Sequence, residues 1–347
     1  MRVLILTQYF TPEICAPSAR LHTFARGLAR EGHEVEVVCE VPNYPQGVVH
    51  PSYRGRAVTR RRMDGFRVAW VWVYTKREKT TRDRLALYGS YAAMATGYAS
   101  LRARPDVIFA SSPPLSVGAA AAALARRHRV PWVMDVRDLW PAAAVALGQL
   151  IDERALRVAE RLERFLYRDA AAVTVVTAPF AEHVERLTTT PVHLIPNGTT
   201  QFWLDAGRAV PDRARAQLSD RFTWTFAGNV GLAQGLETAV EAAQLLGDDF
   251  RLLILGEGSA RLTLERQVAE QAPGLVEFRA QVPKERAAVI LRASDALLVS
   301  LSPSPALEAF VPSKLFDCCA ITKPVVLAVA GEATRRASGA GAALPVA

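Results

Sequence analysis

A short stretch near the end of the chain combines residue types that could bind an anion. In the run Val311-Pro312-Ser313-Lys314-Leu315-Phe316-Asp317, Pro312 and Ser313 suit the first positions of a helix, where free N–H groups carry partial positive charge. Lys314 adds a cation there, and Asp317 follows about one helical turn later. Such a set could hold a diphosphate and the hydroxyls of the neighbouring ribose. An ordinary turn with a solvated Lys and Asp is the alternative.

A glycine-rich turn lies upstream of this stretch. Residues 223–227 predict a strand, and the run Gly228-Asn229-Val230-Gly231-Leu232-Ala233-Gln234-Gly235-Leu236 leads into a helix beginning at Glu237. Glycines at such a turn let backbone amides approach a phosphate. Strand–loop–helix units of this kind are common in α/β proteins, so the loop alone is weak evidence. Its combination with Lys314 favours a single site for a phosphorylated ligand.

Strand-like runs alternate with helical patterns along the chain, which is typical of parallel α/β architecture. The first cycle predicts strands at 3–7, 34–39, 68–73, 107–110, 132–136, 173–177 and 192–195. A second cycle predicts strands at 223–227, 251–255, 276–279, 296–300 and 325–329. We therefore expect two Rossmann-like parallel-sheet domains facing a central cleft, with ligands at the carboxyl ends of the strands. The expected bounds are 1–200, a polar linker at 201–222, and 223–347.

Positive charge is concentrated in one segment of the first domain. From Arg54 to Arg104 there are 13 Lys or Arg and 3 Asp or Glu, a surplus that exceeds the +8 of the whole chain. Nucleic acid, an anionic membrane or a phosphorylated substrate could each attract it. The uncharged stretch 85–101 carries three tyrosines and is too short to span a bilayer. A protein lying on an anionic membrane surface is favoured. A core helix beside a solvated basic loop is the alternative, and both can hold.

The remaining bulk features exclude several classes of protein. The N-terminal run Val3-Leu4-Ile5-Leu6 is too short for a signal peptide, so we expect a cytoplasmic protein. The four cysteines lack C-x-x-C spacing, which argues against disulfides and zinc. A nicotinamide-dependent dehydrogenase would need G-x-G-x-x-G after the first strand, but no glycine precedes Gly27. We therefore discard a redox function.

Further motifs follow one another along the chain. They are Tyr9-Phe10-Thr11-Pro12-Glu13-Ile14, Gly32-His33-Glu34-Val35, Pro42-Asn43-Tyr44-Pro45, Ser111-Ser112-Pro113-Pro114, Asp135-Val136-Arg137-Asp138-Leu139-Trp140-Pro141 and Pro196-Asn197-Gly198. With the two downstream segments, they resemble the retaining glycosyltransferases of family 4, which have the GT-B fold. More narrowly, they resemble the WbuB/WcaI-like enzymes of O-antigen, lipopolysaccharide and colanic acid assembly. The resemblance runs from Met1 to about Ala343.

The resemblance implies a nucleotide-sugar donor site in the second domain. Asn229 and Gln234 stand where many relatives carry Arg and Lys, so Lys314 must supply most of the charge that meets the diphosphate. Asp317 matches the acid that binds the ribose hydroxyls, whereas Ala309 occupies the position of the family's first acid. The expected donor-binding residues are Gly228, Asn229, Gly231, Gln234, Gly235, Gly256, Val282, Ser313, Lys314, Leu315 and Asp317.

The first domain is expected to bind the acceptor. Asp138 would orient or deprotonate the acceptor hydroxyl, with capping of the following turn as its structural alternative. Arg137, Arg20 and Glu13 are the candidate acceptor-binding residues. The family's mechanism would retain the anomeric configuration, with Lys314 stabilising the leaving diphosphate; Asp138 and Lys314 are thus the expected catalytic residues. The resemblance implies no metal and no cofactor.

The resemblance also implies the partners. These are a nucleotide sugar, a UDP-linked N-acetyl-deoxyhexose in our preferred reading, and a polyprenyl-diphosphate-linked saccharide acceptor. No nucleic acid is expected, and the enzyme would be peripheral on the inner face of the cytoplasmic membrane. Relatives continue beyond the final Gly-Ala-Gly-Ala-Ala-Leu-Pro turn into a closing helix, so the second domain is expected to be truncated. A nucleotide-sugar-binding protein without activity and a GT-B UDP-GlcNAc epimerase are the alternative functions.

Overall fold

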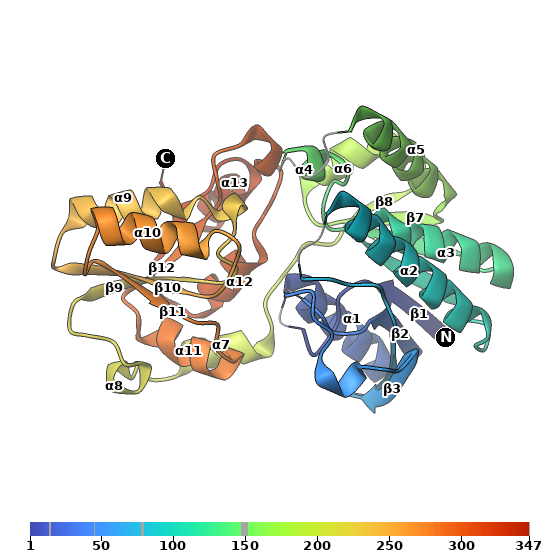
Figure 1. Cartoon of the computed structure of the whole chain (residues 1–347), viewed down its shortest axis with the longest axis horizontal. Coiled ribbons are helices and arrows are strands. Elements are labelled where there is room, and N and C mark those ends of the chain that lie inside the picture. The colour runs from blue at the N-terminus through green and yellow to red at the C-terminus, as the bar shows by residue number, and fades with distance from the viewer. Residues whose placement is uncertain (14, 45, 78–79, 147–151, 347) are drawn as a thin grey trace. The chain divides into compact units, whose positions relative to one another are not determined.

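The computed structural model describes residues 1–13, 15–44, 46–77, 80–146 and 152–346. Ile14 and Pro45 of the sequence motifs, Glu78 and Lys79 of the basic segment, and Ala347 lie outside the described residues. The chain divides into two compact units, Met1–Pro196 and Asn197–Ala347 (Figure 1). Each unit has its own sheet and its own core.

Unit 1 is built on an eight-stranded sheet of order β3-β4-β2-β1-β5-β6-β7-β8. All neighbouring pairs are parallel except β3 with β4, which are antiparallel. The strands are β1 (Arg2–Thr7), β2 (Glu34–Glu40), β3 (Val58–Met63), β4 (Phe66–Val71), β5 (Val107–Ser112), β6 (Trp132–Val136), β7 (Ala172–Val175) and β8 (Val192–Leu194). The uninterrupted apolar run of β1 is buried on both faces, as expected for a central parallel strand. The strand order reverses between β1 and β5, where ligands bind in such sheets.

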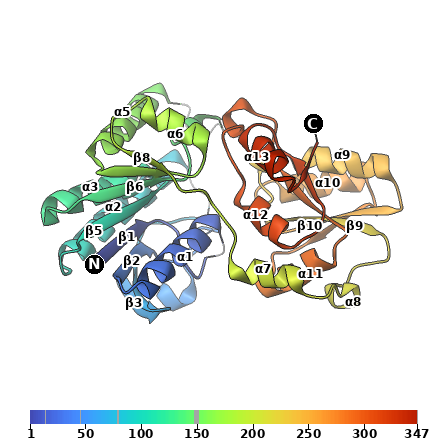
Figure 2. The same cartoon turned by 180° about the vertical axis from the view of Figure 1, so that it is seen from behind.

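Helices cover both faces of this sheet. They are α1 (Ala16–Arg30), the 3₁₀ turn η1 (Pro51–Tyr53), α2 (Thr81–Ser100), α3 (Leu115–His128), α4 (Ala142–Ala146), α5 (Glu153–Asp169) and α6 (Ala178–Glu185). Helix α3 packs against α2 on one side and α5 on the other, so the three form one layer (Figure 1). Helix α1 lies on the opposite face (Figure 2), as right-handed crossovers in the two directions from the switch point require.

Helix α2 turns its tyrosines towards the sheet. The Tyr91 hydroxyl donates to the carbonyl of Val38 at 3.0 Å, and the Tyr98 hydroxyl donates to Glu36 Oε1 at 2.7 Å. The outward face instead carries small residues such as Ala93 and Gly97. Helix α2 is therefore a core helix, as the alternative of the sequence analysis expects, and contact of the basic segment with a membrane stays a prediction. No helix among the described residues combines the length and the apolar character that crossing a bilayer requires.

Unit 2 is built on a six-stranded sheet of order β11-β10-β9-β12-β13-β14, with every neighbouring pair parallel. Its strands are β9 (Phe222–Ala227), β10 (Phe250–Leu255), β11 (Val276–Arg279), β12 (Ala296–Ser300), β13 (Val325–Ala328) and β14 (Leu344–Pro345). Alternate residues of each strand supply the two faces: Phe226 and Ile254 pack in one hydrophobic cluster, and Leu253 and Leu297 lie in others. The strand order reverses between β9 and β12, and this places the glycine-rich loop after β9 at the switch point.

The helices of unit 2 follow the same alternating pattern. They are α7 (Gln201–Arg208), α8 (Arg213–Ala216), the 3₁₀ turn η2 (Leu232–Gln234), α9 (Leu236–Leu246), α10 (Arg261–Gln271), α11 (Lys284–Ala293), the 3₁₀ turn η3 (Pro305–Leu307), α12 (Ser313–Ala320) and α13 (Glu332–Ala340). Apolar residues of α9 and α10 share the cluster of Phe226, whereas those of α12 and α13 share the cluster of Leu297. Both faces of the sheet are therefore covered.

The structure departs from the sequence prediction at three segments, one of which is the short strand β14 at Leu344–Pro345. Strand β3 was not predicted, because Arg60, Arg61 and Arg62 give it a polar surface as an edge strand. The expected linker 201–222 contains α7 and α8, and α7 packs against α12 and α11. A Cβ at Gly207 would lie 2.0 Å from the carbonyl oxygen of Ala320, so the two helices approach backbone to backbone. The segment after Pro196 is thus packed as part of unit 2 and does not form an unstructured linker.

We expect Gly207→Ala to destabilise unit 2, because the new methyl group overlaps the Ala320 carbonyl oxygen. Overpacking of this kind costs about 1–3 kcal/mol or more. Gly198→Ala is the matched control, since a Cβ there meets no atom within 4 Å. Urea unfolding followed by tryptophan fluorescence should give a lower midpoint for Gly207→Ala alone. Equal midpoints would show that α7 does not pack on α12.

Candidate active site

The loops after β9 and β10 lie against each other at the carboxyl edge of the unit 2 sheet. The Gly228 N–H donates to the carbonyl of Leu255 at 2.9 Å. Gly256 adopts a φ of +152°, and a Cβ there would lie 1.8 Å from the Gly228 carbonyl oxygen. Only glycine permits this close approach, so Gly256 fixes the path of the loop that carries Gly228.

The glycine-rich loop uses several of its amides internally. Gly231 N–H donates to Gln234 Oε1 at 3.0 Å, and Val230 N–H donates to the carbonyl of Glu257 at 2.8 Å. Gln234 and Gly235 close the turn, the latter with a φ of +56°, and Ser300 Oγ donates to the Gln234 carbonyl at 2.7 Å. The Gly228 and Gly231 N–H groups thus have partners within the protein, and their contact with a phosphate stays a prediction. Asn229 N–H has no recorded acceptor in the described part of the chain and remains available.

Lys314 projects under this loop from the first turn of α12. A Cβ at Gly228 would lie 3.0 Å from Lys314 Nζ, so the two sequence segments meet. The Nζ atom is buried 3.8 Å from the centroid of the Phe226 ring and has no hydrogen-bond partner among the described residues. Burial lowers the pKa of Lys314 to about 8. This places a desolvated cation, with donors unused, beside the N-terminus of α12.

Asp317 lies one turn further along α12. Its Oδ1 accepts from Thr199 Oγ1 at 2.7 Å, and burial raises the pKa of its carboxyl to about 6. Thr199 was not singled out from the sequence, because a residue 118 positions away gives no local signal. Ser313 begins the helix after Pro312 and lies in its first turn. Asp317 and Lys314 are three residues apart on α12 and therefore lie on neighbouring positions of the helix surface.

Two other expected donor residues have packing roles. The Leu315 side chain is 4 % exposed and lies in the core cluster beneath α12, so it cannot reach a ligand. The Val282 side chain is partly buried against the cluster of Leu253 and Leu255. Its backbone, rather than its side chain, is what could read a base edge. The helical spacing of α12 explains Leu315, because it lies on the buried face between Lys314 and Asp317.

In unit 1, the centre of the candidate site is a residue that sequence analysis did not select. Asp135 is fully buried and accepts from Ser111 Oγ at 2.8 Å, Thr174 Oγ1 at 2.9 Å and Arg20 Nη2 at 3.2 Å. Arg137 Nε donates to Ser111 Oγ at 2.6 Å. This network ties β5, β6, β7 and α1 together at the carboxyl edge of the sheet. Sequence analysis could have selected Asp135 because an acidic residue stands there near the end of an otherwise apolar strand.

Arg20 and Glu13 are engaged inside unit 1. Arg20 also donates to the carbonyls of Ile195 and Pro196 at 3.0 and 3.1 Å. Glu13 Oε1 accepts from the backbone N–H groups of Asn43 and Tyr44, both at 2.8 Å. Glu13 therefore joins two sequence motifs by holding the loop after β2. The geometry gives both residues positioning roles within unit 1, and the acceptor contacts expected from the sequence stay a prediction.

Asp138 remains the best candidate for proton chemistry in unit 1. Its Oδ1 is buried and has no hydrogen-bond partner among the described residues. No side-chain cap by Asp138 is recorded there either, which removes the support for the structural alternative. Burial raises the pKa of Asp138 to about 6, and the neighbouring Arg137 opposes the rise. No group of three or more His, Cys, Asp or Glu residues in the described part of the chain is placed to hold a metal ion.

We expect the buried amine of Lys314 to cost stability. In the folded protein it loses its proton near pH 8, whereas in the unfolded chain it does so near 10.5, so the unfolded state binds more protons in this window. The free energy of unfolding should therefore rise between pH 8 and 10.5. Lys314→Met should abolish that rise and raise stability at pH 7 by at most on the order of 3 kcal/mol. Lys284→Met, at an exposed position, is the control. Denaturant unfolding at several pH values measures both effects, and an unchanged pH profile would contradict the burial of the charge.

Comparison with known proteins agrees with this architecture. Residues 16–198 match the family described as "Glycosyl transferase 4-like domain". WcaI of Escherichia coli (strain K12), named as a colanic acid biosynthesis glycosyl transferase, is 26 % identical over 339 residues, which cover 92 % of this chain and 81 % of WcaI.

Two solved structures share the fold over almost the whole chain. Sucrose-phosphate synthase from Thermosynechococcus elongatus has a TM-score of 0.76 at 18 % identity, over 99 % of this chain and 85 % of that one. Anabaena HepE in complex with UDP-glucose has a TM-score of 0.64 at 15 % identity, over 96 % and 82 %. The two Rossmann-like parallel-sheet units are those of the GT-B fold. The chain belongs to the glycosyl transferase 4-like family and is a glycosyltransferase.

Proposed function

We propose that the protein is a retaining glycosyltransferase that moves a sugar from a nucleotide-diphosphate sugar to a lipid-linked saccharide in surface polysaccharide synthesis. The observation that carries this proposal is the buried, unpartnered amine of Lys314 beneath the Gly228 loop. A desolvated cation with unused donors is stabilised by an anion such as a diphosphate. The name of WcaI supports polysaccharide synthesis, and the HepE complex with UDP-glucose supports a nucleotide-sugar donor.

Unit 2 would bind the donor through α12. With a pKa of about 8, Lys314 is largely protonated at pH 7 and pairs with the diphosphate, which also receives the free N–H groups at the start of α12. Asp317 accepts hydrogen bonds from the ribose hydroxyls. As the glycosidic bond breaks, negative charge grows on the departing diphosphate, and Lys314 stabilises it. We expect these groups to serve without a metal ion, and we propose a UDP-linked N-acetyl-deoxyhexose as donor.

Unit 1 would bind the acceptor at the carboxyl edge of β5 and β6. Asp138 orients the acceptor hydroxyl and can take its proton only when ionised, which its pKa of about 6 allows at neutral pH. Arg137, held by Ser111, contacts the acceptor phosphate. Retention of configuration follows front-face attack, in which the leaving diphosphate is the other possible proton acceptor.

Thermal unfolding with UDP, GDP, UDP-GlcNAc and NAD, all in EDTA, tests the donor site. We expect one nucleoside diphosphate to raise the unfolding midpoint, and NAD to have no effect. Lys314→Met should weaken binding at least about tenfold, because it removes a charged hydrogen-bond donor. Asp317→Asn should reduce the preference for UDP over 2′-deoxy-UDP. If the protein unfolds cooperatively but no nucleotide raises its unfolding midpoint, the proposed donor site is wrong. Incubation with the nucleotide sugar and a lipid-linked acceptor tests the reaction itself. Epimerised free donor, or donor binding without transfer, would contradict the proposed transfer.

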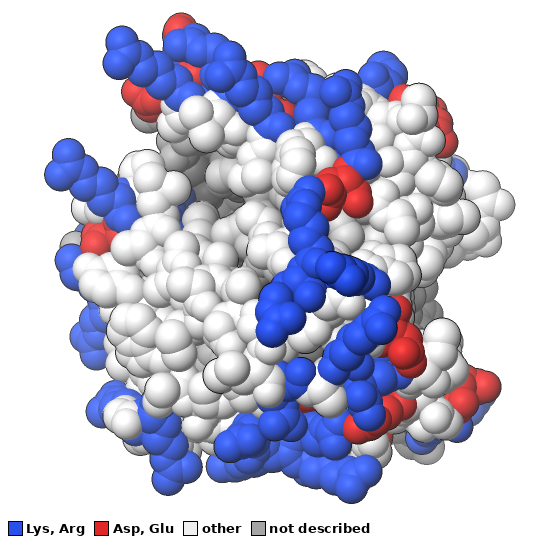
Figure 3. Space-filling model, turned by 90° about the vertical axis from the view of Figure 1, so that its right-hand side faces the viewer, with Lys and Arg blue, Asp and Glu red and all other residues white. Residues whose placement is uncertain are grey.

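A peripheral position on the inner face of the cytoplasmic membrane is the second part of the proposal. Support comes from the outward side of α5, which carries the exposed residues Arg154, Arg157, Arg161 and Arg168 with Val158 and Phe165 between them. Figure 3 shows Lys and Arg gathered along the upper edge of this face, at the height of α5 in Figure 1. Anionic lipids attract such a helix at about 1 kcal/mol per Arg, and Phe165 can enter the interface.

Sedimentation with lipid vesicles tests this surface. The double variant Arg161→Glu, Phe165→Ser should lose binding to vesicles that contain anionic lipid. The matched control is Leu262→Ser, Arg266→Glu on α10, which changes an exposed apolar–basic pair at the same spacing in unit 2. Binding to neutral vesicles should be weak for every protein. Equal binding by both double variants would exclude α5 as the contact.

A further inference from the structure

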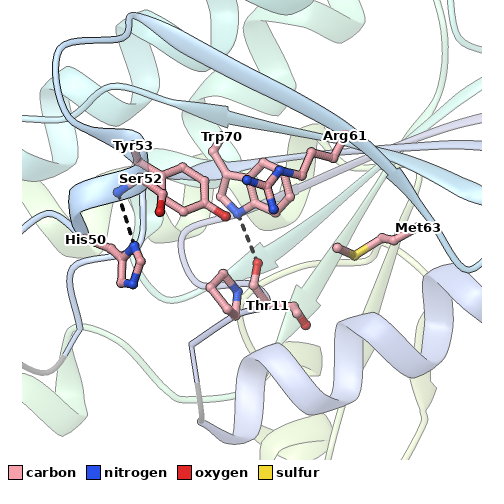
Figure 4. Close-up of a pocket in the computed structure, with 8 residues that line it drawn as sticks. Thr11, His50, Ser52, Tyr53, Arg61, Met63 and Trp70 are labelled. Carbon is pink, nitrogen blue, oxygen red and sulfur yellow. Dashed lines mark hydrogen bonds between the residues drawn. The ribbon is translucent and has the colours of Figure 1, made fainter.

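Unit 1 contains a cavity of about 270 Å³ that has no role in the donor and acceptor sites proposed above. It lies between η1, strands β3 and β4, and the loop after β1 (Figure 4). Its lining residues are Thr11, Pro12, His50, Ser52, Tyr53, Arg61, Met63 and Trp70. The volume is slightly below the range of about 300–1,000 Å³ typical of pockets for drug-sized ligands. The space therefore suits a single ring.

The pairing of β3 with β4 places one arginine over this cavity and turns its neighbours away. Thr59 pairs with Trp70, and Arg61 pairs with Val68. Because side chains alternate along a strand, Arg61 and Trp70 share a face, whereas Arg60 lies on the other. Trp70 Nε1 donates to the Thr11 carbonyl at 3.0 Å, which fixes the indole ring at the base of the cavity.

Aromatic rings form the inner wall. Tyr53 and Trp70 are 5 % and 1 % exposed, with ring centroids 5.4 Å apart at an angle of 65°. His50 lies edge-to-face with Tyr53 at 6.0 Å. Figure 4 shows the three rings in a row, with Arg61 reaching towards Tyr53 and Trp70. Because the Tyr53 and Trp70 rings are buried, they close the inner end of the cavity with apolar side chains.

The polar groups at the rim are mainly hydrogen-bond donors. The Arg61 guanidinium carbon lies 5.9 Å from the Tyr53 ring centroid, and no hydrogen bond or ion pair of this guanidinium is recorded among the described residues. His50 Nδ1 accepts from the Ser52 N–H at 3.4 Å, so the imidazole proton lies on Nε2, which is a donor. Donors above an apolar wall select a ring with an anionic oxygen group, and a planar guanidinium matches phosphate or carboxylate.

We infer that this cavity binds a single sugar ring that carries a phosphate or a carboxylate. This inference rests on the proposed function, because it makes the cavity a subsite for the saccharide acceptor. Arg61 pairs with the anionic group and His50 donates from Nε2. The buried Tyr53 and Trp70 form the apolar floor beneath the sugar. The anion can belong to a sugar phosphate or to an acidic sugar.

Calorimetric titration of the full chain with glucose 1-phosphate, glucuronate and glucose tests the inference. At least one anionic sugar should bind, and glucose should bind much more weakly. Arg61→Gln should weaken the binding by about tenfold or more, as loss of a charged hydrogen bond does. Arg60→Gln is the matched control, since its exposed side chain lies on the opposite face of β3, and it should change the affinity less than about twofold. The tighter of the two anionic sugars identifies the source of the charge.

Titration of UDP and of the Lys314→Met variant separates this inference from the donor proposal. Binding of the anionic sugar should survive in Lys314→Met, and binding of UDP should survive in Arg61→Gln. If Arg61→Gln binds the anionic sugars like the unchanged protein, or if neither sugar binds while UDP does, the cavity assignment is overturned and the donor site stands. If UDP fails to bind and Arg61-dependent sugar binding persists, the donor proposal fails and the cavity assignment stands.

Discussion

The desolvation of the Lys314 amine is the constraint around which unit 2 is organised. Three features bring it about: the Phe226 ring beneath the amine, the Gly228 loop beside it, and the close approach of Gly256 that fixes that loop. A charge without a hydrogen-bond partner is unfavourable there, even above the face of the Phe226 ring. It persists because the surrounding β9, β10 and α12 are held by their own cores. The free energy given up in folding is available to an anionic ligand, which can restore the missing interactions.

The buried carboxylate of unit 1, Asp135, has hydrogen-bond partners, in contrast to the Lys314 amine. Asp135 receives hydrogen bonds from Ser111, Thr174 and Arg20, so its carboxylate is satisfied before any ligand arrives. Such a network is rigid, and it can hold Arg137 in place through Ser111. The contrast separates two kinds of polar residue at the strand ends. Those that are already paired hold the surrounding structure, whereas Asp138 Oδ1 and Lys314 Nζ have no hydrogen-bond partner among the described residues and are the groups that we propose act on a substrate.

The sequence predicted the positions of most strands better than the directions of individual side chains. Runs such as Val3–Leu6 have a local cause, the burial of a central parallel strand, and the meeting of Lys314 with Gly228 follows from the switch-point rule. The inward orientation of Tyr91 depends on how α2 rotates against β2, which residue types alone do not determine. The same holds for Glu13, whose partners are backbone N–H groups of a distant loop.

The three consecutive arginines of β3 have a consequence for how this protein could diversify. Arg60 and Arg62 point to one side of the strand and Arg61 to the other, so adjacent residues contribute to opposite surfaces of β3. A substitution at position 61 would alter the rim of the cavity while leaving the opposite surface and the strand pairing as they are. Because β3 is an edge strand, a substituted side chain there contacts few other residues. Substitutions at position 61 can therefore change ligand preference with little effect on the free energy of folding.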